Sequence, residues 1–388
     1  MSQSLLQEYD YGIVGGGIAG MQLALALIGD SHFADASILI IEQDSKDSND
    51  KTLCFWEQGV GQWDDLITHR WSHGQFVNSN GKVNSLNLDT YAYKLLPSLH
   101  FYQYAQGKLL NDQRVTWVNA AVTNIEESKN AVAISIDSGQ TYTVEHCFDS
   151  RVTIDYAEII KNSAMVYQPF IGLEVEFEEP VFDADSFTMM DYQYRTDDNT
   201  AFFYILPLSS TRAFVEYTLF VPDLPPDMGV YIPHIHHYIR DTISSSDYQV
   251  NHTEQGMIPM SNYPFHDSNT DRLTKIGTAG SWVRPSTGYA FKYIEYYVGK
   301  VINNLKSGRR PSHNLFNKRH QMMDTLLLDL LKVENHLGPW LFDTMYREVP
   351  VTLIFKFLDG NTTLIEDIKI MNSFQWMPFF RAIRRQWF

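Results

Sequence analysis

The chain has 388 residues, which is more than one simple core needs and corresponds to about two or three domains. Hydrophobic residues make up 44% and charged residues 20%, a balance typical of a globular protein rather than a disordered one. The net charge of −16 argues against binding to a nucleic-acid backbone and against general adsorption to anionic lipid, so any membrane contact would be local.

Cysteine content and hydropathy argue against several further classes. The two cysteines, Cys54 and Cys147, cannot make a disulfide framework, and no CxxC or Cys/His cluster indicates a metal site. The segment MSQSLLQEYD lacks the features of a secretory signal, and no stretch approaches ~18 uncharged apolar residues. We therefore expect a cytoplasmic protein with no spanning helix and no metal. Aromatic residues at 14% fit either a large core or a pocket for a big apolar ligand.

The predicted elements begin with a β-prone segment at 9–14, followed by glycines, an apolar helical run at 21–28 and a buried strand at 37–41. Alternation of apolar and polar residues returns at about 115–136. From about residue 168, successive β-rich stretches predict an antiparallel sheet: FIGLEVEF, SFTMMDYQY, TAFFYILPL and RAFVEYTLF. Residues 273–291 return to strand, glycine turn and a helix from about Thr287, and the chain from about Arg309 onward is mostly helical.

The first glycine-rich segment has the spacing of a dinucleotide-binding turn. Gly15, Gly17 and Gly20 form G-x-G-x-x-G directly after the first strand and at the start of the first helix. Gly15 makes the tight turn, Gly17 lets the backbone approach a pyrophosphate, and Gly20 permits close helix packing. Glu42 ends the next strand 22 positions after Gly20, where it would accept hydrogen bonds from the adenosine ribose. This context predicts a nucleotide site, and NAD and FAD both fit it.

A second glycine turn favours FAD. Gly277-Thr278-Ala279-Gly280 follows a late strand and precedes a helix. FAD needs a second approach of backbone to its ribityl and pyrophosphate region, whereas a simple NAD domain does not. The fold class we expect is therefore α/β: an FAD-binding Rossmann-like domain of the glutathione-reductase/hydroxylase type, an inserted antiparallel β-sheet substrate domain and a helical C-terminal region. The expected limits are 1–78, 106–165 and 266–308 for the FAD-binding domain, 79–105 and 166–265 for the substrate domain, and 309–388 for the helical region.

Several motifs in chain order resemble the FAD-dependent lycopene cyclases of the bacterial and plant type. They are the N-terminal unit, Asp50 to Glu57 (DKTLCFWE), Phe148 to Arg151 (FDSR), Leu206-Pro207 with Arg212 to Thr218 (RAFVEYT), and Gly277 to Gly280 with Arg284 to Tyr289 (RPSTGY). The likeness runs from about residue 8 to at least 360. It implies conversion of the open ψ-ends of lycopene into β-ionone rings, without net redox change, by an enzyme that uses reduced flavin.

The resemblance assigns Glu216 as the catalytic residue, either as cation stabiliser or as proton-shuttling acid. The implied chemistry is protonation of a terminal alkene, attack by an internal alkene, and loss of a proton, which needs an acid in a dry pocket and electron-rich walls. Strand alternation places Glu216 on one face with Phe214 and Thr218, opposite Val215 and Tyr217. Tyr217 stands where plant members have a second acid, so the motif supplies one carboxylate rather than two.

The remaining candidate residues are assigned to the cofactor. For Arg151 a structural ion pair, and for Trp56 a packed core position, are equally good interpretations. Asp149-Ser150-Arg151 also departs from the Gly-Ala-Asp-Gly-like turn of flavin aromatic hydroxylases. The full set expected to bind FAD is Gly15, Gly17, Ala19, Gly20, Glu42, Gln43, Thr52, Trp56, Arg151, Gly277, Ala279, Gly280, Pro285, Thr287, Gly288 and Tyr289.

The expected partners are a lipophilic polyene (lycopene), NADPH as electron source and, peripherally, the inner membrane, with no nucleic acid. The segment from Phe374 to Phe388 interleaves aromatics with three arginines, which suits an interfacial helix, and it fits equally a helix that closes the domain core. Two rival functions remain open on this fold: a flavin monooxygenase or prenyl reductase acting on another isoprenoid, and a prenyl-lipid carrier without catalysis.

Overall fold

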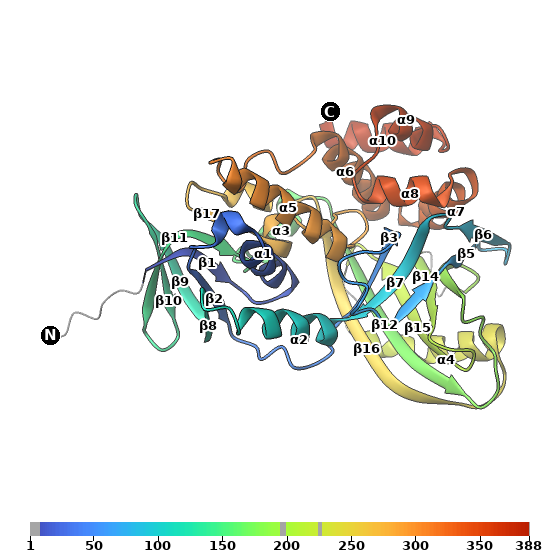
Figure 1. Cartoon of the computed structure of the whole chain (residues 1–388). Coiled ribbons are helices and arrows are strands. Elements are labelled where there is room, and N and C mark those ends of the chain that lie inside the picture. Colours follow the sequence, from blue (N-terminus) through green and yellow to red (C-terminus); the bar gives the residue numbers. More distant parts are fainter. Residues whose placement is uncertain (1–7, 195–198, 224–226, 388) are drawn as a thin grey trace.

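The computed structural model describes residues 8–194, 199–223 and 227–387. Figure 1 shows two β-rich regions side by side, with the helices of the C-terminal end lying above the second region. The α/β class, with its inserted sheet and helical C-terminal region, is confirmed.

The first sheet carries the expected nucleotide-binding topology. Its strands are β1 (Glu8–Val14), β2 (Ile38–Glu42), β8 (Val115–Asn119), β9 (Val122–Glu127), β10 (Val132–Ile136), β11 (Thr141–Asp149) and β17 (Leu273–Lys275). The parallel order is β8-β2-β1-β11, β17 pairs with the end of β11, and β10 and β9 continue as an antiparallel meander. β2 is buried along its whole length, as the apolar run ILII predicts for a central parallel strand.

Three helices cover one face of this sheet, and apolar residues of the meander cover the other. The helices are α1 (Ile18–Gly29), α2 (Ser98–Leu109) and α5 (Phe291–Lys306). α1 contains no charged residue and buries most of its first two turns, because it lies between the sheet and the other two helices. This burial fixes the N-terminus of α1 at the carboxyl end of β1, where the glycine turn lies.

The second sheet is long and strongly curved in Figure 1. Its order is β16-β12-β15-β14-β13-β5-β6. The strands are β5 (His73–Val77), β6 (Val83–Asn87), β12 (Met165–Phe177), β13 (Ser186–Asp191), β14 (Thr200–Pro207), β15 (Arg212–Phe220) and β16 (Tyr248–Ser261). All pairs are antiparallel except β13 with β5. α3 (Tyr156–Asn162) and α4 (Ile232–Tyr238) contribute to the core on one face.

The other face of the second sheet packs against a small sheet and the C-terminal helices in one shared core. The small sheet has the order β3 (Thr52–Gln58), β7 (Tyr91–Pro97), β4 (His69–Trp71). The C-terminal helices are α6 (Lys318–Val333), α7 (Gly338–Glu348), α8 (Val351–Leu358), α9 (Leu364–Met371) and α10 (Trp376–Trp387). Short turns of helix complete the chain: η1 (Ser31–Phe33), η2 (Met228–Tyr231), η3 (Ile239–Ile243), η4 (Phe265–Ser268), η5 (Gly277–Gly280) and η6 (Asn335–Leu337).

One predicted boundary is wrong. The helix expected from about Thr287 begins at Phe291, because residues 284–289 form a tight turn in which the Arg284 N–H donates to the Tyr289 carbonyl. β5 belongs to the second sheet, although its residues fall in the range 1–78 that we expect to form the first part of the FAD-binding domain. The domain limits themselves stay a prediction. Among the described helices, none has the length and apolar character needed to cross a membrane.

Candidate functional site

The turn between β1 and α1 accepts only glycine at two positions. Gly15 has a φ of +99°, and a Cβ there would lie 1.9 Å from Ser150 Oγ. A Cβ on Gly20 would lie 2.0 Å from the carbonyl oxygen of Gly15, so the first turn of α1 could not pack this closely on the strand end. The spacing of the motif therefore follows from close backbone contacts within the turn.

Gly17, the middle glycine of the motif, borders open space, which fits a phosphate group. A Cβ on Gly17 would meet no atom within 4 Å, and Gly17 is the N-cap of α1 without a side-chain capping bond. The N–H groups of the first turn therefore have no capping side chain, and the N-terminus of a helix stabilises an anion through such groups and through the helix dipole. The residues present thus fit the pyrophosphate of a dinucleotide.

Glu42 ties the glycine turn to the end of β2. Its Oε2 accepts a hydrogen bond of 2.5 Å from the Gly16 N–H, and its Oε1 accepts one of 2.8 Å from the Asp44 N–H. The carboxylate is buried, yet each of its oxygens can accept a further bond, so a ribose contact stays compatible with this geometry. The neighbouring Gln43 is exposed.

The second glycine turn lies directly against the first turn of α1. Gly277 has a φ of +59°, and a Cβ there would lie 3.2 Å from the Cβ of Ala19. A Cβ on Gly280 would lie 2.3 Å from the carbonyl oxygen of Lys275, so this position also requires glycine. Within the described part of the chain, the buried Ser281 Oγ has no hydrogen-bond partner. Two glycine turns in contact, with an unsatisfied hydroxyl beside them, fit an extended ligand that crosses both.

Arg151 makes the ion pair that was one of its two interpretations. Its Nε lies 2.9 Å from Asp149 Oδ1, while Lys275 Nζ lies 2.8 Å from Asp149 Oδ2. These three residues line a cavity of about 330 Å³, together with Ala279 of the second glycine turn. Arg151 therefore stabilises the end of β11, and its contact with the cofactor stays a prediction.

The turn at 284–289 is anchored by the C-terminal helices. Arg284 is fully buried, with its Nε 3.2 Å from Asp324 Oδ1 on α6, and it donates to two carbonyls at the end of α8. Gly288 has a φ of +72°, and a Cβ there would lie 2.9 Å from Gln168 Oε1. Pro285 and Thr287 are half-buried in the same turn. The turn presents Tyr289 to the shared core and is held there by a buried ion pair.

An aromatic cluster surrounds the end of this turn. The Trp56 ring is buried on β3, stacks on Phe355 with centroids 4.5 Å apart, and meets the Tyr289 ring edge-on, also at 4.5 Å. Trp56 Nε1 donates a 2.9 Å hydrogen bond to Asp359 Oδ1. Burial raises the pKa of Asp359 to about 7. Trp56 is thus a packed residue that borders a small cavity with Tyr289 and Asp359, and no sequence motif indicated Asp359.

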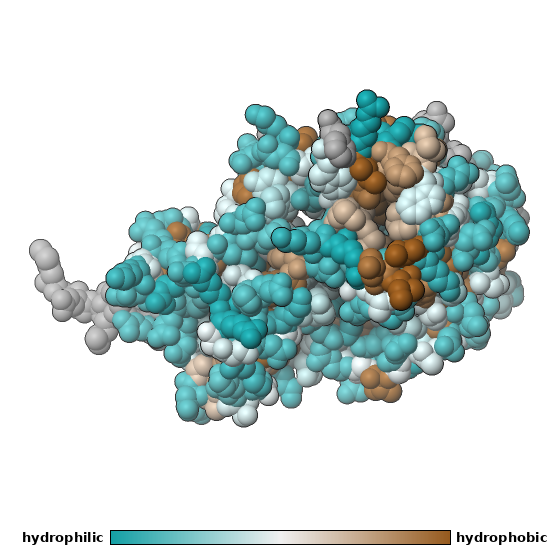
Figure 2. Space-filling model, turned by 90° about the horizontal axis from the view of Figure 1, so that it is seen from above, coloured by the Kyte–Doolittle hydropathy of each residue, from teal (hydrophilic) through white to brown (hydrophobic). Residues whose placement is uncertain are grey.

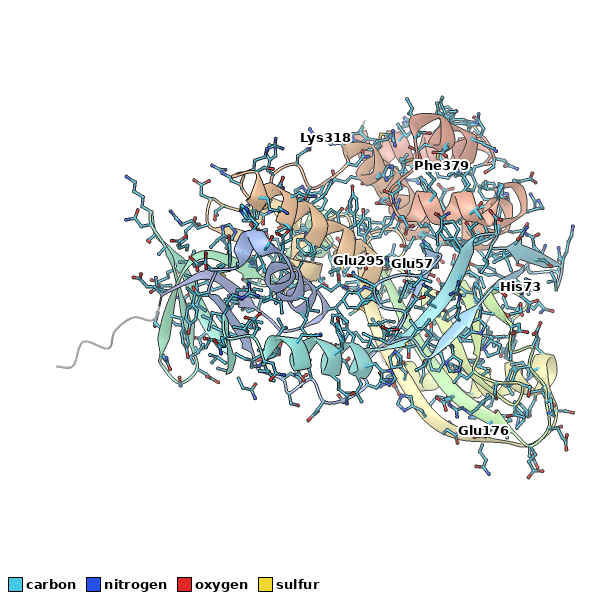
Figure 3. The ribbon with its side chains drawn as sticks, viewed as in Figure 1. Glu57, His73, Glu176, Glu295, Lys318 and Phe379 are labelled. Atoms are coloured by element: carbon cyan, nitrogen blue, oxygen red, sulfur yellow. The ribbon has the colours of Figure 1, made fainter. Side chains whose placement is uncertain are left out.

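Charged residues next to Trp56 form a closed network. Lys292 Nζ lies 2.7 Å from Glu57 and 2.6 Å from Glu295, two residues that Figure 3 shows close together between β3 and α5. Lys94 is fully buried and pairs with the same Glu57 at 3.0 Å, and also with Asp64. These pairs join β3, β7 and α5, which is a structural role.

Glu216 lies on the face of β15 that the alternation predicts. Phe214 belongs to the core shared with the aromatic cluster, whereas Val215 and Tyr217 belong to the core on the opposite face. The Glu216 side chain accepts a short hydrogen bond from Thr218 Oγ1. Burial, reinforced by the nearby charge of Glu254, raises the pKa of Glu216 to about 7. An acid with this pKa holds a proton near neutral pH and can donate it.

Strand register extends the polar character of this face across the sheet. Tyr204 of β14, Glu216 of β15, Gly172 of β12 and Glu254 of β16 lie opposite one another, so their side-chain positions share one face. Thr52 Oγ1 donates a 2.6 Å hydrogen bond to Glu254 Oε2, and the expected contact of Thr52 with the cofactor stays a prediction.

A chain of phenols leads from this row to the 284–289 turn. The Tyr204 hydroxyl donates to the Tyr93 hydroxyl at 2.7 Å, and the Tyr93 and Tyr289 hydroxyls lie 3.4 Å apart. Burial raises the pKa of all three phenols, so they are neutral at ordinary pH. This series of phenols connects residues from β14, β7 and a distant turn. These residues are far apart in the sequence, so no sequence motif indicated the series. No group of three or more metal-ligating side chains occurs among the residues that the structure describes.

The C-terminal segment has features of both helices that its sequence fits, one that closes the core and one that lies at a membrane interface. Phe379, labelled in Figure 3, is buried, and Arg381 and Arg385 form ion pairs with Glu334, so part of α10 closes the core. Figure 2 shows hydrophobic residues gathered on the upper face over these helices. The exposed large side chains of α9 and α10 are Leu364, Ile365, Ile368, Trp376, Met377, Phe380 and Trp387.

Comparisons with known proteins agree with this geometry. The family described as "Lycopene cyclase protein" matches residues 10–384. No curated protein matches the chain.

Among solved structures, a geranylgeranyl bacteriochlorophyll reductase-like protein from Thermoplasma acidophilum has a TM-score of 0.59 at 12% identity, covering 98% of this chain and 97% of that one. The flavin-dependent brominase Bmp2 has a TM-score of 0.64 at 14% identity, covering 98% and 100%. p-Nitrophenol 4-monooxygenase PnpA from Pseudomonas putida DLL-E4 has a TM-score of 0.59 at 12% identity, covering 96% and 99%. At these identities the likeness establishes the fold.

Proposed function

Because the chain belongs to the lycopene cyclase family, we propose that it is an FAD-dependent lycopene cyclase that forms β-ionone rings from the ψ-ends of lycopene. The product would be β-carotene, formed by way of γ-carotene, with no net redox change. The observation that carries this proposal is Glu216, a proton-holding carboxyl on a sheet face that it shares with an aromatic core.

Glu216 would donate a proton to the terminal alkene of the substrate. Its raised pKa keeps the proton on the carboxyl until an alkene reaches it, and the apolar surroundings exclude water that would trap the cation. Aromatic side chains such as Phe214 would then stabilise the positive charge through their ring faces. Proton loss from the ring completes an isomerisation in which substrate and product have equal mass.

The two glycine turns would hold FAD. Gly15, Gly17 and the N-terminus of α1 suit the pyrophosphate, Glu42 suits the ribose, and Gly277 suits the ribityl region. When bound in reduced form, the flavin would supply an electron-rich ring that stabilises positive charge, and NADPH would keep it reduced. The chain would thus hold and orient the FAD, while the carboxyl group of Glu216 would supply the proton.

The exposed side chains of α9 and α10 would dock the enzyme on the inner membrane, where a polyene resides. Trp376, Met377 and Phe380 point outward while Phe379 is buried, so replacing the three outward side chains with serine should spare the core. We expect liposome flotation to fall several-fold in this triple variant, because apolar burial drives interfacial binding. Flotation should stay unchanged in a Val230→Ser control, which replaces an exposed apolar residue of η2, outside these helices. Unbound wild-type protein would contradict membrane docking.

The function is tested with purified protein, reduced FAD and lycopene in liposomes. We expect cyclic product of the same mass as lycopene and no stoichiometric consumption of NADPH. Steady NADPH oxidation with a change in product mass would indicate a monooxygenase or prenyl reductase. Purified protein without flavin absorbance that binds polyene unchanged would indicate a carrier.

A further inference from the structure

Glu254 lies near Glu216 on the same face of the second sheet, although 38 positions separate them in the sequence. β12 lies between their strands, and its Gly172 is opposite both residues. Two strand spacings correspond to about 10 Å between the two backbones. In other enzymes carboxyl groups about 6.5–9.5 Å apart act on a group held between them.

An aromatic ring covers the sheet between the two carboxylates. A Cβ on Gly172 would lie 2.2 Å from Cζ of Phe214, so the ring of Phe214 covers the glycine. Any side chain on residue 172 would displace this ring. Two carboxylates on either side of a buried ring form a surface that attracts positive charge from three directions.

Glu254 is held differently from Glu216. The hydroxyl of Thr52 donates to its Oε2 at 2.6 Å, and the Thr52 N–H donates to its Oε1 at 3.3 Å. Glu216 accepts a hydrogen bond from Thr218 of its own strand. The two carboxyl groups therefore share one face of the sheet but have different partners: a neighbour on the same strand for Glu216, and the hydroxyl and N–H of Thr52 on another sheet for Glu254.

Among the residues that the structure describes, Glu254 is the charged group that acts on Glu216. The neutral titratable groups facing it there are Cys54 of β3, Tyr204 of β14 and Tyr289 of the 284–289 turn. Burial raises the pKa of Cys54 to about 12 and also raises those of both tyrosines, so all three are neutral at ordinary pH. Further along β15, Arg212 pairs with Glu174 of β12 at 3.2 Å.

We propose that Glu254 is the second catalytic carboxylate of this site and accepts the proton that leaves the new ring. This inference rests on the proposed cyclisation. The O–H bond of Glu216 breaks as a C–H bond forms at the terminal alkene, and the internal alkene then forms the ring C–C bond. A C–H bond beside the cation breaks, its electron pair forms the ring double bond, and its proton forms an O–H bond on Glu254. Exchange with solvent returns one proton to Glu216 and removes one from Glu254, so no oxidant or reductant is consumed.

The kinetic test compares wild type, Glu254→Gln and Glu174→Gln as holoenzymes with dithionite-reduced FAD and lycopene liposomes from pH 5 to 9. In the wild type, kcat/KM should fall on the alkaline side, because Glu216 must carry its proton. Glu254→Gln should lower kcat about 100-fold, a scale typical of losing a general base, and should keep the alkaline fall. Glu174→Gln, which removes a carboxylate from the same face, should retain wild-type kcat within a few-fold. Wild-type kinetics in Glu254→Gln would overturn the assignment.

A second readout is independent of the substrate. The ¹³C carboxyl resonance of Glu216, identified by its loss in Glu216→Gln, should titrate at lower pH in Glu254→Gln, because a neighbouring negative charge has been removed. An unchanged midpoint would contradict the pair. A wild type that leaves lycopene unchanged while this midpoint shifts would contradict the proposed function and leave the charge coupling standing.

Discussion

The two faces of the second sheet are built from the same strands but have different chemistry. On one face, Val215 and Tyr217 pack with Phe203 and α4 in an apolar core. On the other face, Glu216 lies in one row across the sheet with Tyr204 and Glu254. This face packs against a core lined by aromatic rings. Polar groups on the first face take part in local hydrogen bonds, such as that from the Tyr238 hydroxyl to the buried Asp191. On the second face, the same burial converts a carboxyl into an acid that keeps its proton near neutral pH.

The largest expected difference between the faces is in catalysis. Glu216→Gln should lower the turnover of lycopene by about 10²–10⁴-fold, because it removes the proton donor while preserving shape. Tyr217→Phe, the neighbouring residue on the opposite face, should retain turnover within a few-fold. Product formation by purified holoenzymes, followed by chromatography, measures both. Equal activity in Glu216→Gln and wild type would remove Glu216 from the mechanism.

For stability, the order of the two faces should be reversed: a change on the apolar face should cost more than a change at Glu216. Tyr217 is completely buried, so Tyr217→Ala should lower the free energy of unfolding by about 3–5 kcal/mol, as large-to-small changes of aromatic core residues do. Glu216→Gln should not lower it. Denaturant unfolding of the two variants compares the faces directly, and a loss of several kcal/mol in Glu216→Gln would show that Glu216 is mainly structural.

Activity should depend on pH through the catalytic face alone. The pKa of Glu216 is raised to about 7, so the fraction that carries a proton falls tenfold per pH unit above that value. We expect kcat/KM to decline with this slope on the alkaline side. A profile that stays flat from pH 7 to pH 9 would contradict a proton supplied by Glu216.

The smallest effect is a pH-dependent change in stability. In the unfolded chain Glu216 ionises near 4.5, whereas in the folded protein it retains its proton to about 7. The folded state is therefore favoured at low pH, and this contribution is lost as pH rises through that window. Glu216→Gln lacks the ionisation, so it should exceed wild type in stability by about 1–3 kcal/mol at pH 8 and by little at pH 4.5, values reduced for partial exposure. Equal stability of the two proteins at both pH values would contradict the raised pKa.

Local patterns predicted the parts of the molecule that depend on neighbours in sequence. The G-x-G-x-x-G turn after β1, the burial of β2 and the facing of Glu216 all follow from short-range spacing and strand alternation. The start of α5 was misplaced because turn residues 284–289 are held by Asp324 on α6, a contact that local sequence does not encode. Glu254 was missed for a related reason, since β12 brings it near Glu216 only after both strands pair with it.

The site residues assigned to FAD stay predictions, and the structure refines how some of them act. Thr52 contacts Glu254, Arg151 pairs with Asp149, and Trp56 binds Asp359, a residue 303 positions away. The contacts of Thr52 and Trp56 join distant segments, so composition and spacing could indicate these two residues but not their partners. The partner of Arg151 is only two positions away.

Expression in a bacterium that accumulates lycopene tests the central claim most directly. The wild-type chain should change the pigment from red to orange, with β-carotene replacing lycopene at equal mass, and Glu216→Gln should leave lycopene in place. An unchanged lycopene profile in cells that contain folded, flavin-loaded wild-type protein would contradict the assignment as a lycopene cyclase.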